Sequence, residues 1–115
     1  MQLTSGKSKG EIPPGTLEML ILKTLKRQGP THGYGIAKSI QQISEDVLRV
    51  EEGSLYPALQ RILLKGWVTA DWVQAGPKRR TRVYQLTPAG RKQLGAELSE
   101  YRRVSQAIER VIQPA

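Results

Sequence analysis

Ahead of Gly66, apolar residues recur at helical spacing in three stretches of the chain. Within residues 16–28, 34–43 and 51–66, they follow the spacing of three or four that places side chains on one face of a helix. Only a short connection separates the first two helices, so these helices are expected to pack as neighbours. The residues expected to face inward are Leu17, Met19, Leu20, Ile21, Leu22 and Leu25 in the first helix, Ile36, Ala37, Ile40 and Ile43 in the second, and Leu55, Leu59, Ile62 and Leu63 in the third.

The third helix has a second face of different character. Ser54, Ala58, Arg61 and Lys65 share helical spacing, so this face is small and hydroxylic at its amino end and cationic further along. Such a helix can pack on a core with one side and meet a phosphate-lined groove with the other. An ordinary amphipathic helix with a solvated polar face has the same pattern, so the rest of the chain has to distinguish the two.

After Gly66 the apolar period changes from the helical spacing to alternation. Residues 67–73 alternate and residues 81–86 are rich in β-prone side chains, so they predict a β-hairpin with its turn at 75–80. A further short extended segment is expected at residues 48–50. The cations at or near the hairpin tip are Lys78, Arg79, Arg80 and Arg82.

The last part of the chain predicts one long helix, from Pro88 to about residue 113. Thr87 supplies an N-cap and Pro88 suits the first helical position. The apolar residues are spaced alternately by four and three, a heptad pattern with a polar break at Ser105. A helix this long cannot bury its far end in so small a domain, so a second copy is the economical partner. The residues expected in this interface are Leu94, Leu98, Tyr101, Ile108 and Ile112.

Composition narrows the class of partner. The 115-residue chain has a formal net charge of +8, which favours a polyanion such as DNA, RNA or an anionic membrane surface. It contains no Cys, which excludes disulfides and thiolate chemistry. No apolar run approaches the ~18–20 residues that span a bilayer, and no signal peptide precedes the domain. A cytoplasmic protein without a membrane partner is therefore expected.

The chain offers little for an enzyme. His32 is its one histidine and leaves no plausible zinc set, so it is expected to cap a helix or to pack at a turn. Residues 33–39 are glycine-rich, but Ala37 stands where a Walker phosphate loop needs a glycine before Lys38, and no apolar strand precedes them. No catalytic residue, metal or cofactor is expected.

The predicted order of elements is helix, helix, helix, hairpin, helix, with a basic hairpin tip. This is the order of a winged helix-turn-helix, in which the third helix enters the major groove and the hairpin is the wing. The expected fold class is mainly α with a small β-hairpin. Residues 1–12 would form a flexible basic tail, 13–87 the DNA-binding domain and 88–115 a C-terminal dimerisation helix.

Several short motifs recur along the predicted elements and together cover about residues 13–98. They are Gly15-Thr16-Leu17, His32-Gly33-Tyr34-Gly35-Ile36, Gly53-Ser54-Leu55-Tyr56-Pro57-Ala58-Leu59 with Arg61, Gly66-Trp67, Arg79-Arg80 and Tyr84-Gln85-Leu86-Thr87-Pro88-Ala89-Gly90. This set of motifs resembles that of the PadR family of bacterial transcriptional regulators. Two departures from the family pattern, Val83 beside Tyr84 and the Gly-Pro pair at the hairpin tip, concern the wing and not the fold.

The resemblance implies a homodimeric repressor that binds a palindromic site in double-stranded DNA, in the subgroup with a single C-terminal helix. Some relatives respond to small aromatic compounds bound near the dimer interface, so a small aromatic effector is a further possible partner. A winged helix that contacts protein or RNA, without a specific DNA operator, is the alternative reading.

The candidate DNA-binding residues have different expected roles. Near the amino end of the third helix, Pro57 can meet a thymine methyl group, while Ser54 and Tyr56 can contact phosphate or serve capping and packing. Residues further along that helix, on the second helix and on the wing are expected to hold the backbone. These backbone residues are Tyr34, Lys38, Arg61, Lys65, Lys78, Arg79 and Arg80.

Overall fold

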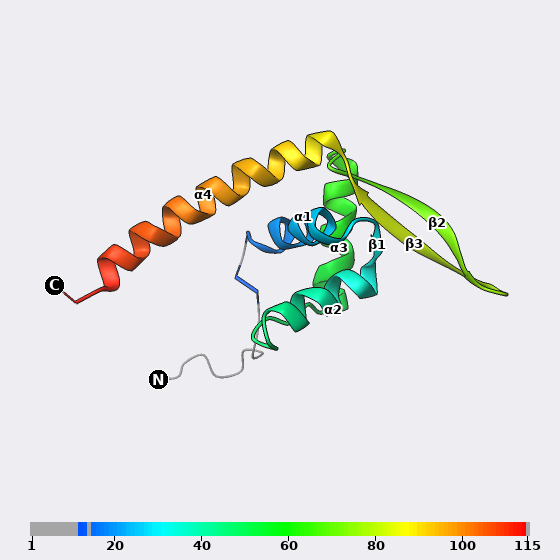
Figure 1. Ribbon diagram of the computed structural model, residues 1–115, viewed down its shortest axis with the longest axis horizontal. Helices are drawn as coiled ribbons and strands as arrows, with labels where there is room; N and C mark the ends of the chain where they lie inside the picture. The colour runs from blue at the N-terminus through cyan, green and yellow to red at the C-terminus, as the bar shows by residue number, and fades with distance from the viewer. Residues whose placement is uncertain (1–11, 14, 115) are drawn as a thin grey trace.

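The computed structural model describes residues 12, 13 and 15–114, so the tail expected at residues 1–12 lies almost entirely outside the described residues. A helical body forms the centre of the molecule, and a β-hairpin and a long helix extend from it in opposite directions (Figure 1). The mainly helical winged helix-turn-helix fold predicted from the sequence is confirmed. The elements in chain order are α1 (Leu17–Gln28), β1 (Thr31–His32), α2 (Gly33–Ile43), α3 (Glu52–Leu64), β2 (Val68–Gly76), β3 (Arg79–Leu86) and α4 (Pro88–Ile112).

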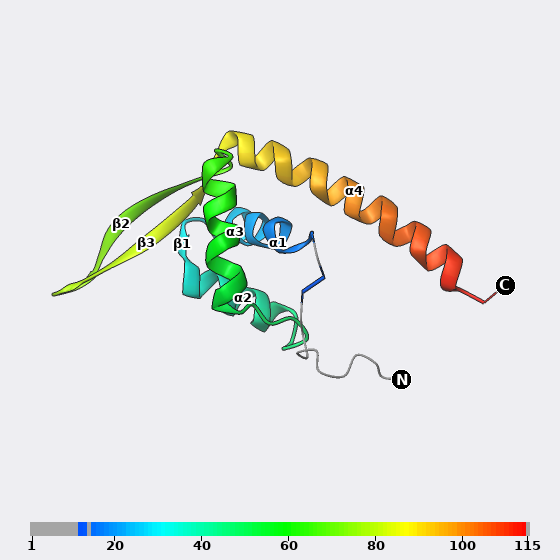
Figure 2. The same ribbon diagram turned by 180° about the vertical axis from the view of Figure 1, so that it is seen from behind.

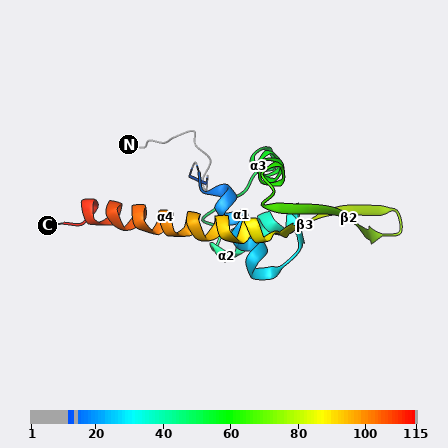
Figure 3. The ribbon, with the colours of Figure 1, turned by 90° about the horizontal axis from the view of Figure 1, so that it is seen from above.

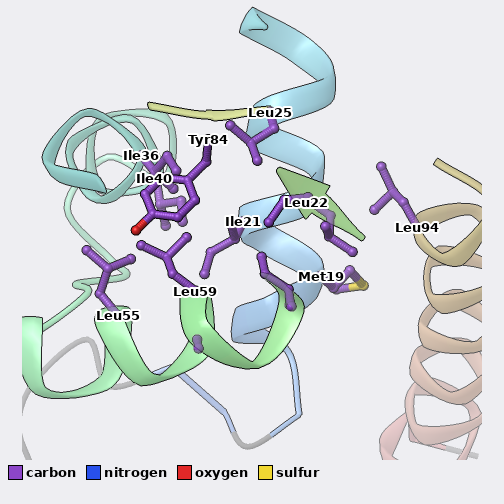
Figure 4. Packing of buried hydrophobic residues seen from close by; sticks show 13 residues of the cluster. Met19, Ile21, Leu22, Leu25, Ile36, Ile40, Leu55, Leu59, Tyr84 and Leu94 are labelled. Atoms are coloured by element: carbon purple, nitrogen blue, oxygen red, sulfur yellow. The ribbon is translucent and has the colours of Figure 1, made fainter. Parts of the chain in front are cut away.

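The first three helices enclose the core, and their apolar faces meet there as the spacing predicts (Figure 4). Ile43 is an exception, because its side chain is 56% exposed. Its prediction as an inward residue was wrong, since it is the last residue of α2 and the chain turns away after it. Glu45 and Asp46 make that turn with positive φ angles of 54° and 68°. The most deeply buried large side chains are Ile21, Leu22, Ile36, Leu55, Leu59, Ile62, Val68 and Leu94.

The sheet of the described chain has three strands in the order β1-β3-β2. Strands β2 and β3 form the predicted hairpin, but they are longer than predicted and leave only Pro77 and Lys78 between them. Strand β1 was not predicted, and it pairs with Tyr84 and Val83 of β3. This pairing joins the base of the hairpin to the start of α2. Residues 48–50, where a short extended segment was expected, do not pair with any strand of the sheet.

Helix α4 begins where the sequence predicts. The Thr87 hydroxyl accepts a hydrogen bond from the Gly90 amide at 3.0 Å, which is the N-cap contact. The first turns of the helix then pack on α1, and the later turns leave the body (Figure 2). Leu94 lies in the core beside Leu22 and Met19, only 1% exposed (Figure 4). Its prediction as a dimer-interface residue was therefore wrong, since its own chain already buries it.

Candidate nucleic-acid interface

Helix α3 has one buried side and one exposed side. The buried side is formed by Leu55, Ala58, Leu59 and Ile62. Ala58 had been expected on the polar face, and this expectation was wrong. The buried stripe of α3 includes Ala58 in addition to the larger apolar residues beside it. The opposite side, called here the outer face of α3, is formed by Gly53, Pro57, Gln60 and Leu64.

Two residues of the outer face were missed by the sequence reasoning. Gln60 and Leu64 continue the spacing of Pro57 along the exposed side, and Leu64 is 77% exposed although it is apolar. The signal was available, because residues spaced by three and four on the side opposite the apolar stripe share one face. A primary amide and an aliphatic side chain on an exposed helix are suited to base edges and thymine methyl groups.

Ser54 and Tyr56 lie on the two flanks of the outer face, and both are exposed. Helix α3 begins at Glu52 with Glu51 at the N-cap, so Ser54 is not the capping residue that the sequence allowed. The Tyr56 ring packs against Gly33 at the start of α2, where an added Cβ would lie 3.1 Å from ring atoms. Tyr56 therefore links the two helices of the helix-turn-helix while part of its ring stays in solvent.

Arg61 and Lys65 both form ion pairs with one carboxylate of the same chain. The Arg61 Nε lies 2.6 Å from one carboxylate oxygen of Glu18 on α1, and the Lys65 Nζ lies 3.7 Å from the other. Both cations are on the α1 side of α3, away from Tyr56. About half of each cationic side chain is exposed. Their charges are thus shared with Glu18, which the sequence pattern could not indicate.

The amino end of α2 is a second exposed element beside α3. His32 caps the helix, because its Nδ1 accepts a hydrogen bond from the Gly35 amide at 3.0 Å. This outcome confirms the structural role expected for His32. The Tyr34 ring stacks on the His32 ring at 6.4 Å and is 66% exposed, and the Lys38 Nζ lies 5.9 Å from the Tyr34 ring centre. A phenol and an ammonium group are thus held together in solvent.

The wing supplies the other cations. Lys78, Arg79 and Arg80 are all exposed, at or next to the turn. Arg80 and Arg82 both lie over the ring of Trp72, with guanidinium carbons 5.3 and 5.7 Å from the ring centre. The contact of Trp72 with these arginines was not predicted. The sequence groups the four wing cations by charge alone, so it did not show that Arg82 is less exposed than the other three. The hairpin register places Trp72 directly opposite Arg82.

Beyond the body, the later turns of α4 expose an apolar stripe to solvent. Leu98 packs partly against the core, so only the later turns are free. The stripe, called here the α4 stripe, is formed by Tyr101, Val104, Ile108, Val111 and Ile112, which are between 41% and 83% exposed. Figure 3 shows α4 and the hairpin extending to opposite sides of the body, with α3 on a third side.

A three-helix body with an exposed third helix and a basic hairpin defines a winged helix-turn-helix protein. The family comparison is more specific, since the profile described as "Transcriptional regulator PadR-like family" matches residues 21–96. The chain belongs to the PadR-like family of transcriptional regulators. The resemblance indicated by the sequence motifs is confirmed.

The chain is also similar to individual bacterial proteins. The chain is 36% identical over 72 residues to the transcriptional regulator Rv3488 of Mycobacterium tuberculosis, a match covering 63% of either protein. It is 41% identical over 88 residues to an uncharacterised 37.1 kDa transposon protein of Streptomyces fradiae, which covers 76% of this chain but only 24% of that longer protein.

Solved structures have the same fold. A transcriptional regulator from Clostridium thermocellum superposes with a TM-score of 0.80 at 24% identity, over 86% of this chain and 95% of that one. The Bacillus subtilis PadR, solved in complex with operator DNA, superposes with a TM-score of 0.67 at 27% identity, over 75% of this chain and 48% of that one.

Membership in this family separates the chain from enzymes, because PadR-like transcriptional regulators are DNA-binding proteins without catalytic activity. The glycine-rich segment at 33–39, which failed the phosphate-loop pattern, is instead the start of α2 and contacts Tyr56 through Gly33. Within the described residues, no helix is long and apolar enough to cross a membrane.

Proposed function

We propose that the chain is a sequence-specific repressor that binds an operator in double-stranded DNA as a homodimer. The observation that best supports this proposal is the outer face of α3, which is exposed while the other side of the helix is anchored in the core. A helix held this way fits the major groove of B-DNA. Because such a protein acts on chromosomal DNA, the cytoplasm is its proposed location.

The cations on either side of α3 support the same placement of the duplex. With α3 in the major groove, Tyr34 and Lys38 contact the backbone beside it, and the exposed wing cations contact the backbone or the adjacent minor groove. Arg61 and Lys65 reach a phosphate only by sharing or leaving Glu18. The wing and α2 therefore supply the larger part of the phosphate contacts.

Base recognition is assigned to the outer face of α3. Pro57 presents an apolar ring suited to a thymine methyl group, and Gln60 carries an amide that can pair with adenine in the major groove. Both are exposed near the middle of the face. The operator complex solved for the Bacillus subtilis relative supports DNA as the class of partner.

The α4 stripe is the proposed dimer interface. An isolated helix with five exposed apolar residues is costly in water, and a second copy related by a two-fold axis buries the same residues from both chains. Two copies of α3 would then face the DNA, which predicts a palindromic operator with half-sites about one helical turn apart.

The groove between α1 and α4 is the proposed place for a small aromatic effector. It has a volume of about 390 Å³, and its walls include Met19, Tyr101 and Val104. Two of these residues belong to the α4 stripe, so the partner's helix would close the groove. Release of operator DNA by a panel of phenolic compounds, together with a higher melting temperature, tests this part of the proposal.

Selection of bound sequences from random duplexes tests the DNA-binding proposal. The intact protein should enrich a palindrome. Gln60→Ala should lose the preference at one position in each half-site, a discrimination of about 1–3 kcal/mol, while still binding random DNA. Absence of any enriched duplex, with tight binding to RNA or to a protein, would instead support the alternative reading of a winged helix used for other contacts.

Sedimentation of Ile108→Asp tests the dimer. The aspartate places a charge in the centre of the α4 stripe, so the variant should sediment as a monomer. Gln106→Asp adds the same charge at an exposed polar position of the same helix and should remain dimeric. A dimer that survives in Ile108→Asp at micromolar concentration means that another surface holds the two chains together.

A further inference from the structure

A groove lies where the wing meets the start of α2, separate from the outer face of α3. It has a volume of about 370 Å³, and we call it the wing-base groove. Among the described residues that line it, none carries a carboxylate. Its walls are mostly aromatic and its charges are those of two arginines. The lining residues are His32, Gly33, Tyr34, Tyr56, Trp72, Arg80, Thr81, Arg82 and Tyr84.

The alternation of β3 explains why arginines line this groove. Tyr84, Arg82 and Arg80 are two residues apart, so they lie on one face of the strand. Tyr84 is buried in the core, which means that this face points into the protein at the base of the hairpin. Further out the same face passes into solvent through Arg82 and then Arg80.

The Arg82 guanidinium lies close to two aromatic rings. Its guanidinium carbon lies 5.7 Å from the centre of the Trp72 ring and 6.0 Å from that of Tyr84. The Arg82 Nε is buried and has no hydrogen-bond partner among the described residues. No carboxylate in the described part of the chain forms an ion pair with it either. A half-buried cation with no counter-charge in the described part of the chain favours an anion supplied from outside.

The geometry of the groove selects the kind of anion. The amino end of α2 opens onto it through Gly33 and Tyr34, and the partial positive charge of a helix amino end adds to that of the arginines. The guanidinium forks match the oxygens of a phosphate, while the exposed Trp72 ring offers a flat apolar surface to the adjoining sugar. The groove lies beside Tyr56 of α3, so the outer face of α3 and the groove can meet one duplex.

We propose that the wing-base groove binds one backbone phosphate of each operator half-site, with Arg82 as its main contact and Trp72 and Tyr84 holding the guanidinium in place. This inference rests on the proposed DNA-binding function. It divides the wing into two parts: the exposed cations of the turn attract DNA over a range of positions, and the base of the wing fixes the register of the backbone against α3.

The salt dependence of binding to a mixed-sequence duplex is the first test, because it needs no operator. Arg82→Ala should weaken binding about tenfold or more and should flatten the slope of log K against log salt by about 0.9 for each phosphate that is no longer neutralised. Arg91→Ala removes one exposed arginine on α4, outside the groove, and should keep the wild-type slope. An Arg82→Ala slope equal to wild type overturns the proposal.

Arg82→Lys separates phosphate binding from packing. An ammonium group still neutralises a phosphate but lacks the planar fork and stacks less well, so this variant should recover the slope and only part of the affinity. If both Arg82 variants have a flattened salt slope and both have a lower melting temperature than Arg91→Ala, then Arg82 only packs the wing and the proposal is wrong.

Neutral methylphosphonate linkages, introduced one at a time into the selected operator, locate the phosphate. The wild-type protein should lose affinity at one position per half-site, and Arg82→Ala should be insensitive at that same position while both proteins lose affinity equally elsewhere. A penalty that is identical for both proteins at every position contradicts the groove assignment. That outcome would leave the operator, and with it the proposed repressor function, intact.

Discussion

Replacing Gly90 by alanine should destabilise the protein through one backbone contact. Gly90 is buried in the first turn of α4, and a Cβ added there would overlap the carbonyl oxygen of Trp67 and approach Leu86 Cδ1 to 2.8 Å. The Trp67 carbonyl also accepts a hydrogen bond from the Thr87 amide at 3.1 Å. Because these neighbours are mainly backbone, no side-chain rotation can relieve the overlap, and α4 has to move away from the end of α3.

The expected cost follows from two opposing terms. Alanine is better than glycine in a helix interior by about 1 kcal/mol. Overpacking a rigid site costs typically 1–3 kcal/mol and sometimes more, and here the overlap is with backbone. Because the overlap is with backbone, the upper part of that range, about 2–3 kcal/mol, applies. The net loss expected for Gly90→Ala is then about 1–2 kcal/mol, which corresponds to a melting temperature lower by roughly 5–15 °C for a domain of this size.

Gly95→Ala, one and a half turns along the same helix, is the matched control. No atom lies within 4 Å of the position that its added Cβ would take, so only the propensity term remains and the variant should gain about 0.5–1 kcal/mol. Thermal and urea unfolding of both variants give the comparison. A Gly90→Ala protein as stable as Gly95→Ala would refute the packing described between α4 and Trp67. Since that contact fixes α4 against α3, operator affinity should fall more than affinity for random DNA.

Two further predictions concern charge and protonation. Glu18→Gln should lower the free energy of unfolding by about 0.5–1 kcal/mol, as expected for half-exposed ion pairs. The same change releases Arg61 and Lys65, so it should steepen the salt dependence of DNA binding. Glu100→Gln makes the same charge change on α4 and should leave the salt dependence unchanged; equal slopes for the two variants would exclude Arg61 and Lys65 from the interface. Burial raises the pKa of Tyr84 above 10.0, only partly offset by Arg82, so its contribution to stability is full below pH 10.0 and is lost as the pH rises through the higher folded-state pKa. Tyr84→Phe should therefore lose less stability than wild type between neutral and strongly alkaline pH, and parallel pH profiles would argue against a buried phenol.

The sequence by itself determined the four helices, the β-hairpin and their order, but not strand β1. Helical spacing located α1, α2 and α3, alternation located the hairpin, and the Thr87-Pro88 pair located the start of α4 to the residue. These are local signals, because periodicity and capping depend on neighbours within a few positions in the chain. The family motifs are local in the same sense, so the fold class and the kind of regulator were within reach of the sequence.

Only the tertiary structure decided which of these side chains already contact other parts of the chain. Leu94 and Ile108 belong to one heptad pattern, but the packing of α1 buries the first and leaves the second exposed. Arg61 of α3 and Arg82 of the wing are equivalent cations in the sequence pattern, yet Arg61 is paired with Glu18 and Arg82 lies near the rings of Trp72 and Tyr84. A pattern along the chain tells which face a residue occupies. The element that packs against that face comes from a distant part of the sequence, and the local pattern does not depend on it.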